Sequence, residues 1–256
     1  DGYNLYIDHI DEIATYLKIL KEADVPVLWR PFHELNGGWF WWGRGYDEMK
    51  KLWQIMYRRY TEHHGLNNII WTWNVNEHND WADDFEKYYP GDDYVDVLTV
   101  DVYDPGYPNH NHSELQALAN GKPLGLGEVG PMPNPDQMRD HWPDAVYFLE
   151  WARCLTEACH NGTRFNSTGK VQAVYDHPYM LTHDEMPDIL TEYAVAADSP
   201  YRIQKNSSRE NRDHPIRLSD MLTSGTLFSL NGAAISWYSR SNSHRYSDAV
   251  GPGVYM

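Results

Sequence analysis

Five apolar segments of strand length alternate with helix-like segments over the first 190 residues, and this alternation constrains the fold more than any other feature. The five segments are Val25–Phe32, Asn68–Val75, Tyr94–Tyr103, Lys122–Glu128 and Ala145–Trp151. Apolar residues at steps of three and four predict helices over 6–23 and 46–63, and a short helix over 113–120. Near-continuous apolar strands separated by helices are typical of a parallel sheet buried on both faces.

Polar or charged residues occur at the carboxyl ends of four predicted strands. They are Glu34, Asn74 with Asn76, Asp101 with Tyr103, and Glu128. A barrel with its active site on the carboxyl face requires this recurrence. A doubly wound sheet would show the same alternation, but we find no Gly-rich phosphate loop after any strand. We therefore predict an α/β fold of the (β/α)8 TIM barrel type. Because the chain opens in a helix with about five of eight strands present, we expect an N-terminally truncated barrel.

Charge and hydropathy exclude several classes of partner. The 256 residues suffice for one barrel-sized domain, and the formal net charge of −16 argues against nucleic acid and anionic membranes. No stretch approaches roughly 18 consecutive apolar residues, so we expect no membrane span, and the first residues do not resemble a signal peptide. Asn-X-Ser/Thr triplets at Asn111, Asn161, Asn166 and Asn206 are compatible with a secreted, extracellular protein.

The spacing of cysteine and histidine predicts no metal site. The only two cysteines, at positions 154 and 159, could pair locally but cannot make a disulfide framework. His63-His64 and the pair His110 and His112 lie in polar, loop-like contexts, where we expect solvated side chains rather than zinc ligands. We expect no metal and no other cofactor.

The C-terminal part differs in composition from the rest. Residues 201–217 are polar and indicate a linker, while Thr226–Trp237 is predicted to form a β-hairpin that turns at Asn231-Gly232. We therefore expect a partial catalytic barrel over residues 1–190 and a tail over residues 191–256 that is not part of the catalytic domain.

The segment VLWRPFHELNGGWFWWG, residues 27–43, indicates the chemistry. Aromatic faces beside a carboxylate suit a sugar, whose C–H faces stack on rings while its hydroxyls form hydrogen bonds. Glycoside hydrolysis needs two carboxyl groups, and Glu34 and Glu128 are the only Glu residues that close a predicted strand. Trp42 in the aromatic cluster and Asn74 at a strand end are candidate substrate-binding residues. The alternative interpretation of the segment is a salt-bridged Glu beside core tryptophans.

Five motifs, in order along the chain, resemble glycoside hydrolase family 26, whose main activity is endo-β-1,4-mannanase. They are RPFHELNGGWFWWG, WTWNVN, YYPGDDYVDVLTVDVYD, GLGEVG and VYDHPYMLTHDEMPD. The resemblance covers about residues 1–190. It implies a retaining (β/α)8 barrel, with Glu34 as acid/base and Glu128 as nucleophile.

The resemblance also implies substrate-binding residues. His33 matches a His that orients the nucleophile, and Tyr103 matches a Tyr that donates a hydrogen bond to it. Trp39 matches an aromatic at the cleavage site, and Trp151 matches a Trp under the −1 sugar. Family members carry three more strands before this chain's first helix, so we expect weak or no turnover of galactomannan by this chain alone. Residues 223–240 resemble a fragment of a copia-type retrotransposon polyprotein, and we expect no activity from them.

Two functions of different classes remain open at this point. The first is a retaining endo-β-1,4-mannanase acting on mannan or galactomannan, or another family 26 β-glycanase such as a xylanase or mixed-linkage glucanase. The second is a non-catalytic sugar-binding remnant of a truncated barrel. The tail would suggest nucleic-acid processing, against which the charge of −16 argues. We therefore expect a polysaccharide of the β-mannan class as partner, with no nucleic acid and no membrane.

Overall fold

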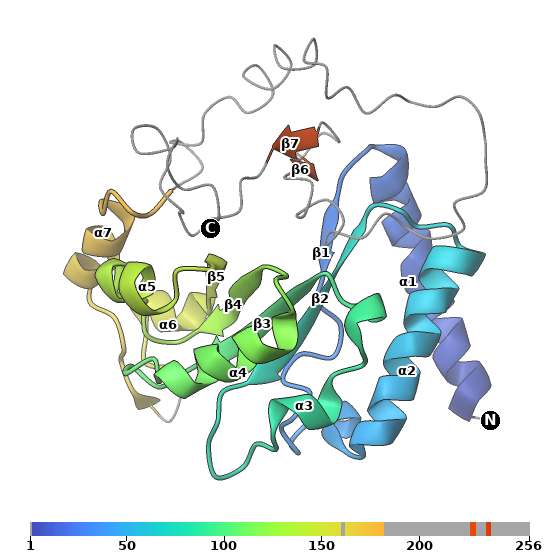
Figure 1. Cartoon of the computed structure of the whole chain (residues 1–256), viewed down its shortest axis with the longest axis horizontal. Coiled ribbons are helices and arrows are strands. Elements are labelled where there is room, and N and C mark those ends of the chain that lie inside the picture. The colour runs from blue at the N-terminus through green and yellow to red at the C-terminus, as the bar shows by residue number, and fades with distance from the viewer. Residues whose placement is uncertain (1, 160–161, 182–225, 229–233, 237–256) are drawn as a thin grey trace. The chain divides into compact units, whose positions relative to one another are not determined.

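The computed structural model of the chain describes residues 2–159, 162–181, 226–228 and 234–236 (Figure 1). Within them lies a five-stranded sheet in the order β1-β2-β3-β4-β5. Its strands are β1 (Val27–Trp29), β2 (Ile69–Asn76), β3 (Val97–Val102), β4 (Leu124–Val129) and β5 (Ala145–Glu150). Parallel pairing from β2 to β5 in sequential order is the arrangement predicted for consecutive strands of a (β/α) barrel.

The five predicted strands are all present, but β1 is shorter than its apolar run. Pro26 and Pro31 flank this strand, and a proline cannot donate a hydrogen bond to the ladder. The chain therefore leaves the sheet at Arg30, and Glu34 lies in the loop that follows rather than at the strand end.

The described residues fall into two compact units. The first unit comprises residues 2–29, 52–70, 226–228 and 234–236, and the second unit comprises residues 30–51, 71–159 and 162–181.

The first unit holds α1 (Gly2–Glu22), β1 and the C-terminal part of α2 (Tyr46–Arg58), which continues into a π-helical turn, η2 (Arg59–His63). The buried stripe of α1 consists of Ile10, Ala14 and Leu17. These residues are spaced by four and three, so burial of one apolar face stabilises the helix. Arg59 donates two hydrogen bonds to the carboxylate of Asp11, at 2.7 and 2.6 Å, and thereby ties η2 to α1.

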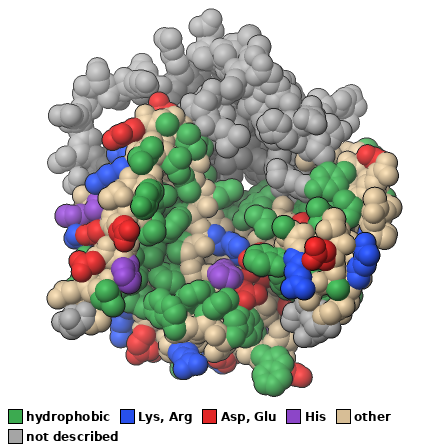
Figure 2. Space-filling model, turned by 180° about the vertical axis from the view of Figure 1, so that it is seen from behind, with side chains coloured by type: hydrophobic (Ala, Val, Ile, Leu, Met, Phe, Trp, Pro, Cys, Tyr) green, Lys and Arg blue, Asp and Glu red, His purple; other side chains and the backbone are tan. Residues whose placement is uncertain are grey.

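Apolar side chains are also exposed on the first unit, and Figure 2 shows hydrophobic side chains gathered on one face of the molecule. Those of α1 and β1 are Tyr3, Leu5, Ile13, Tyr16, Ile19, Leu20 and Leu28.

Within the described residues, no helix combines the length and the apolar character that crossing a membrane requires.

The second unit surrounds strands β3 to β5 with short helices. These are η1 (Trp41–Gly43), α3 (Phe85–Tyr88), η3 (Asp92–Tyr94), α4 (Asn109–Ala119), α5 (Pro135–His141), α6 (Ala152–Thr156) and α7 (Thr168–Tyr175). Helix α4 packs against β3 and β4 (Figure 1). Every residue of β3 and β4 is buried, as predicted for strands covered on both faces. Helix α5 is capped by Asn134, whose side chain accepts hydrogen bonds from the N–H groups of Asp136 and Gln137.

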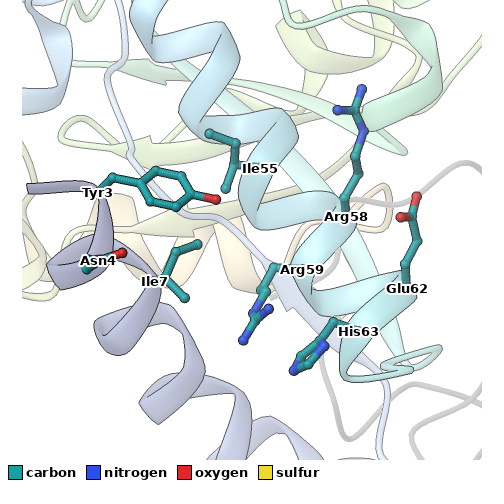
Figure 3. Close-up of a pocket in the computed structure, with 8 residues that line it drawn as sticks. All are labelled: Tyr3, Asn4, Ile7, Ile55, Arg58, Arg59, Glu62 and His63. Carbon is teal, nitrogen blue, oxygen red and sulfur yellow. The ribbon is translucent and has the colours of Figure 1, made fainter.

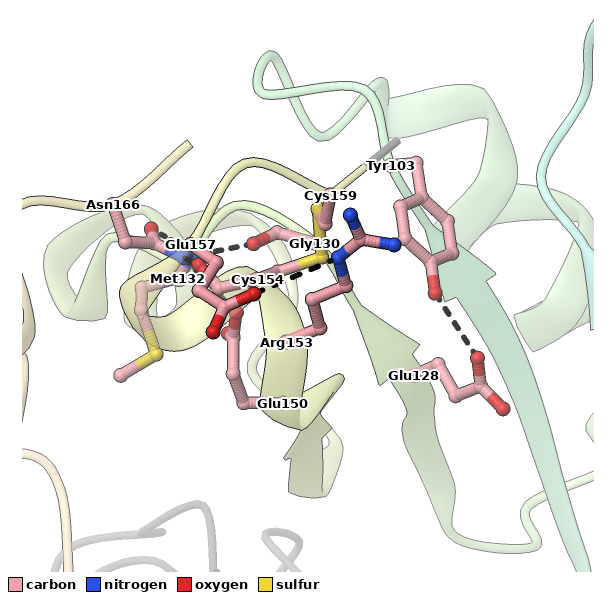
Figure 4. The surroundings of a disulfide bond; sticks show 10 residues. All are labelled: Tyr103, Glu128, Gly130, Met132, Glu150, Arg153, Cys154, Glu157, Cys159 and Asn166. Carbon is pink, nitrogen blue, oxygen red and sulfur yellow. Dashed lines mark hydrogen bonds and ion pairs between the residues drawn. A yellow bond between two sulfur atoms is a disulfide. The ribbon is translucent and has the colours of Figure 1, made fainter. Parts of the chain in front are cut away.

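Cys154 and Cys159 form a disulfide, so the local pairing that the sequence left open is made (Figure 4). The predicted hairpin is confirmed by antiparallel pairing of β6 (Thr226–Phe228) with β7 (Ala234–Ser236). Its turn, the rest of the tail and the expected boundary at residue 190 lie outside the described residues.

The expectation that the histidines near residue 110 are solvated loop residues is wrong for His112. Helix α4 begins at Asn109, earlier than predicted, and its buried face carries His112 together with Leu115 and Ala119 at helical spacing. The ring of His112 contacts the carboxylate of Asp144. Two of the four glycosylation triplets are also inaccessible, because the side chains at positions 111 and 166 are buried.

Candidate active site

The loop after β1 is held in an uncommon backbone conformation. Phe32 and Glu34 have φ values of 54° and 51°, in the left-handed region that side chains rarely adopt. The conformation is held from β2, because Asn74 accepts a hydrogen bond from the Glu34 N–H at 2.8 Å through its side-chain oxygen. The Leu35 N–H donates to the Asn74 backbone carbonyl at 3.3 Å. Strand β2 therefore positions the backbone of Glu34.

The carboxyl group of Glu34 accepts a hydrogen bond from the indole N–H of Trp39 at 2.7 Å. Burial raises the pKa of Glu34, the Trp39 hydrogen bond opposes this rise, and the charge of Glu128 adds to it. A carboxyl group with a raised pKa keeps its proton further toward neutral pH, which suits a general acid.

The carboxylate of Glu128, in β4, is held at both oxygens. Arg30 donates to Oε1 at 2.7 Å. The hydroxyl of Tyr103 donates to Oε2 at 3.1 Å (Figure 4). Glu128 is buried, and Figure 4 shows the Tyr103 hydroxyl pointing toward its carboxylate. Two donors on one buried carboxylate fix its orientation, as a nucleophile requires.

A network of polar side chains from the loop after β1 and from β2 and β3 connects to this carboxylate through Arg30. Arg30 also reaches Asp101 of β3, at 3.2 Å, and burial raises the pKa of Asp101 while the guanidinium opposes the rise. The side-chain N–H2 of Asn74 donates to Asp101 and to Thr99, at 2.6 and 2.9 Å. A Cβ at Gly127 would collide with the Asn74 amide and the Asp101 carboxyl, so only glycine allows this close packing.

The aromatic residues of the loop after β1 pack on one another. The ring of His33 lies 4.6 Å from that of Phe40, and Phe40 stacks on Trp42 at 4.3 Å. The Trp42 indole N–H donates to the His33 carbonyl at 2.8 Å, so Trp42 stabilises the loop. Burial lowers the pKa of His33, and the charge of Glu128 opposes the decrease.

The structure brings most of the sequence-predicted site residues together. Trp39 donates to Glu34 and Tyr103 donates to Glu128, and the charge of Glu128 acts on both Glu34 and His33, all within the second unit.

Three further candidates lie differently. Asn74 is completely buried and its amide is hydrogen-bonded to protein groups, so it holds the backbone of Glu34 rather than facing a substrate. Trp42 is half-buried. Trp151 is 48% exposed, and its N–H donates to the carbonyl of Val129, next to Glu128, at 2.9 Å. Trp71 and Trp73 of β2 are buried, so neither ring is open to a sugar.

Glu34 and Glu128 are not the only glutamates near strand ends. Glu77 directly follows β2, and Glu150 ends β5, where burial raises its pKa to about 8. Sequence patterns locate the end of a strand only to within a few residues. A glutamate at the true end of a strand can therefore be overlooked. Arg30 was missed as a site residue, and Asp101 was noted only as a strand-end charge, although charged residues in apolar runs were the available signal.

Glu77 is a buried carboxyl group close to this site. Its Oε1 accepts hydrogen bonds from the N–H groups of Tyr103 and Asp104, at 2.6 and 2.9 Å. Among the described residues, its Oε2 has no hydrogen-bond partner. Burial raises the pKa of Glu77 to about 7, against the lowering effect of the two N–H donors, and the charges of Asp104 and Glu34 add to the rise.

A separate surface pocket of about 450 Å³ lies in the first unit (Figure 3). Its lining residues are Tyr3, Asn4, Ile7, Ile55, Arg58, Arg59, Glu62 and His63. Asp11, His63 and His64 lie close together beside it, but Asp11 is already bound by Arg59 and by His64. We locate the chemistry at the carboxyl pair, because the pocket offers no pair of carboxyl groups.

Comparison with known proteins places this chain among glycoside hydrolases. The sequence profile of glycosyl hydrolase family 26 matches residues 1–185. A mannan endo-1,4-beta-mannosidase of Thermothelomyces thermophilus is 40% identical over 189 residues, which cover 72% of this chain and 37% of that protein.

Two solved structures are similar to the chain. The structure of GH26A from Muricauda sp. has a TM-score of 0.66 at 40% identity, covering 72% of this chain and 60% of that one. A beta-mannanase from a symbiotic protist of the termite Reticulitermes speratus, complexed with gluco-manno-oligosaccharide, has a TM-score of 0.59 at 30% identity, covering 70% and 54%. The chain thus spans between 37% and 60% of the length of these three relatives.

Proposed function

Because the chain belongs to glycosyl hydrolase family 26, we propose that it acts as a retaining endo-β-1,4-mannanase, with Glu34 as acid/base and Glu128 as nucleophile. One observation carries the proposal: two neighbouring carboxyl groups have different partners. Glu34 receives a hydrogen bond from the neutral indole of Trp39, whereas Glu128 is paired with the guanidinium of Arg30 and the hydroxyl of Tyr103. Environments that separate the protonation of two carboxyl groups are the basis of acid and nucleophile roles.

In the first step, the Glu128 carboxylate attacks the anomeric carbon while Glu34 gives its proton to the leaving oxygen. The raised pKa of Glu34 supports this role, since the group must arrive protonated. In the second step, Glu34 removes a proton from water, and the resulting hydroxide displaces Glu128 with net retention. A retaining mechanism requires carboxyl groups about 5–5.5 Å apart, and we expect this separation between Glu34 and Glu128.

The substrate class is proposed from the relatives and from the aromatic side chains of the site. The Thermothelomyces relative is named a mannan endo-1,4-beta-mannosidase, and the protist enzyme was solved with a gluco-manno-oligosaccharide. Trp39 and Trp151 are 44% and 48% exposed, so their faces are open to the C–H faces of sugars. The charge of Glu128 acts on the ring of His33. We propose that His33 contacts the sugar that Glu128 attacks.

We propose that the protein acts outside the cell on β-mannan polysaccharides, with no nucleic acid and no membrane as partner. The disulfide between Cys154 and Cys159 supports an oxidising compartment. The site is built from residues 30–151, so we propose that the catalytic domain lies within residues 1–190 and that the tail contributes nothing to the cleft.

The test is hydrolysis by residues 1–256 of galactomannan, glucuronoxylan and barley mixed-linkage glucan, measured as released reducing ends. We expect release from galactomannan that disappears in Glu34→Gln and in Glu128→Gln, and that survives in the exposed control Glu12→Gln. NMR of the first product should show the anomeric configuration of the substrate. Preference for xylan or glucan would establish the alternative β-glycanase specificity, and binding of mannan without release from any polymer would establish the non-catalytic sugar-binding alternative.

A further inference from the structure

Trp81 is the most exposed large hydrophobic side chain of the described residues, with 80% of its surface accessible. It lies on the loop 77–84 that follows β2. Its N–H donates to the side-chain oxygen of Asn79 at 2.8 Å, which fixes the backbone just before the indole. An indole that is kept in solvent forgoes the free energy that burial would provide, and its flat faces remain open to the C–H face of a sugar.

The loop that carries Trp81 is fastened to the loop after β1. Ala82 forms an isolated antiparallel bridge with Gly37. Next to the bridge, the Asp83 N–H donates to the Asn36 carbonyl at 3.0 Å, and the Asn36 side chain donates back to the Asp83 carbonyl at 2.9 Å. The indole of Trp81 therefore stands on a backbone held by hydrogen bonds, which is the preorganisation that sugar stacking benefits from.

The same bridge places Trp81 close to the proposed acid/base. A side chain at Gly37 would overlap the indole of Trp39, so that ring lies directly over Gly37. Trp39 in turn donates to Glu34. Bridged residues have Cα atoms about 4.5–5.5 Å apart and neighbours along the chain are about 3.8 Å apart, so the Cα of Trp81 lies within about 10 Å of the Cα of Gly37.

We propose that Trp81 is a stacking platform for a further β-1,4-linked hexose of the polysaccharide, on the leaving-group side and beyond the sugar at Trp39. This proposal rests on the proposed function. Because Glu34 protonates the leaving oxygen, the sugars beside Glu34 and Trp39 belong to the departing part of the chain. The loop that carries Trp81 is bridged to the Trp39 loop at Gly37, and the exposed carboxylate of Asp80, next to Trp81 in the chain, offers acceptors for sugar hydroxyl groups.

The test compares binding of mannobiose and mannohexaose by isothermal titration calorimetry, with Glu128→Gln present in every protein titrated so that the ligand is not hydrolysed. Trp81→Ala should raise the Kd for mannohexaose by about three- to tenfold and leave that for mannobiose unchanged. Trp81→Phe should retain most of the affinity, because a flat ring remains. Tyr16→Ala, which removes an exposed ring from α1 in the first unit, should change neither Kd.

Two results overturn the inference while the proposed function stands: equal mannohexaose affinity with and without Trp81→Ala, or an equal loss for both sugars. Galactomannan hydrolysis by the wild type, measured in parallel, decides the proposed function separately. Binding that depends on Trp81, without any hydrolysis of galactomannan, would support the stacking platform and refute the proposed hydrolytic function. No binding of mannohexaose, together with no hydrolysis of galactomannan by the wild type, would overturn both.

Discussion

Replacing Glu77 by Gln should make the protein more stable at alkaline pH, and by an amount that the structure allows us to estimate. Gln keeps the shape of the side chain and leaves Oε1 in place to accept the N–H groups of Tyr103 and Asp104. It removes only the negative charge, which burial disfavours at this position. The substitution therefore isolates the cost of ionising a buried carboxyl group.

The pKa of Glu77 rises from 4.5 to about 7 on folding, so the folded protein holds the proton more tightly than the unfolded chain does. The stability that this proton contributes is complete below pH 4.5 and is lost as the pH rises through about 7. At about 1.4 kcal/mol per pH unit, the full loss is about 3 kcal/mol. Gln does not titrate, so the advantage of the variant over the wild type should grow by that amount between about pH 4.5 and about pH 8.

Urea unfolding of both proteins at these two pH values measures the difference directly. Glu150, whose pKa is also raised, titrates in both proteins and cancels in the comparison. Glu86→Gln, at an exposed position of α3, is the matched control and should show no such change. A difference between Glu77→Gln and wild type that stays constant with pH, or that shrinks as the pH rises, would refute the reasoning.

Three further predictions follow from contacts at and around the site. Arg30→Met removes the guanidinium that orients Glu128, so kcat on galactomannan should fall by about a hundredfold with little change in KM, as steady-state kinetics would show; an unchanged kcat would contradict the role of Arg30. Asn36→Ala removes hydrogen bonds of a buried amide and should lower the free energy of unfolding by about 2–4 kcal/mol in urea titrations; a loss below about 0.5 kcal/mol would count against it. Replacing Cys154 and Cys159 by Ser should cost about 2 kcal/mol, because so short a loop loses little entropy on closure; a loss of 5 kcal/mol would show that the bond does more than close that loop.

The strands and their order could be predicted because each depends on local composition. The runs that became β2, β3 and β4 are rich in Val, Ile, Leu and Trp, and such runs are recognisable without knowledge of their neighbours. The helix α4 was placed too late, since His112 and the polar residues around it resemble a loop until the sheet beside them is known. Its true start is decided by the packing of its inner face.

The candidate carboxyl groups could be named from the sequence, but their partners could not. Trp39 is five residues from Glu34, whereas Arg30 is 98 residues from Glu128 and 71 from Asp101. A guanidinium at such separations has many possible carboxylates, and only the order and register of β3 and β4 select these two. Glu77 was missed for the same reason, because its importance comes from the backbone of residues 103–104.

The pairing of Arg30 with Glu128 has a consequence for how the protein reaches its native state. Contacts between residues far apart in sequence form slowly, because a long stretch of chain must be ordered before they bring any gain. This ion pair spans 98 residues and encloses β2 and β3 entirely. It can form only after those strands have docked in order, so the nucleophile should acquire its orientation among the last events of folding. In a stopped-flow refolding experiment, the recovery of activity should therefore lag behind the recovery of secondary structure.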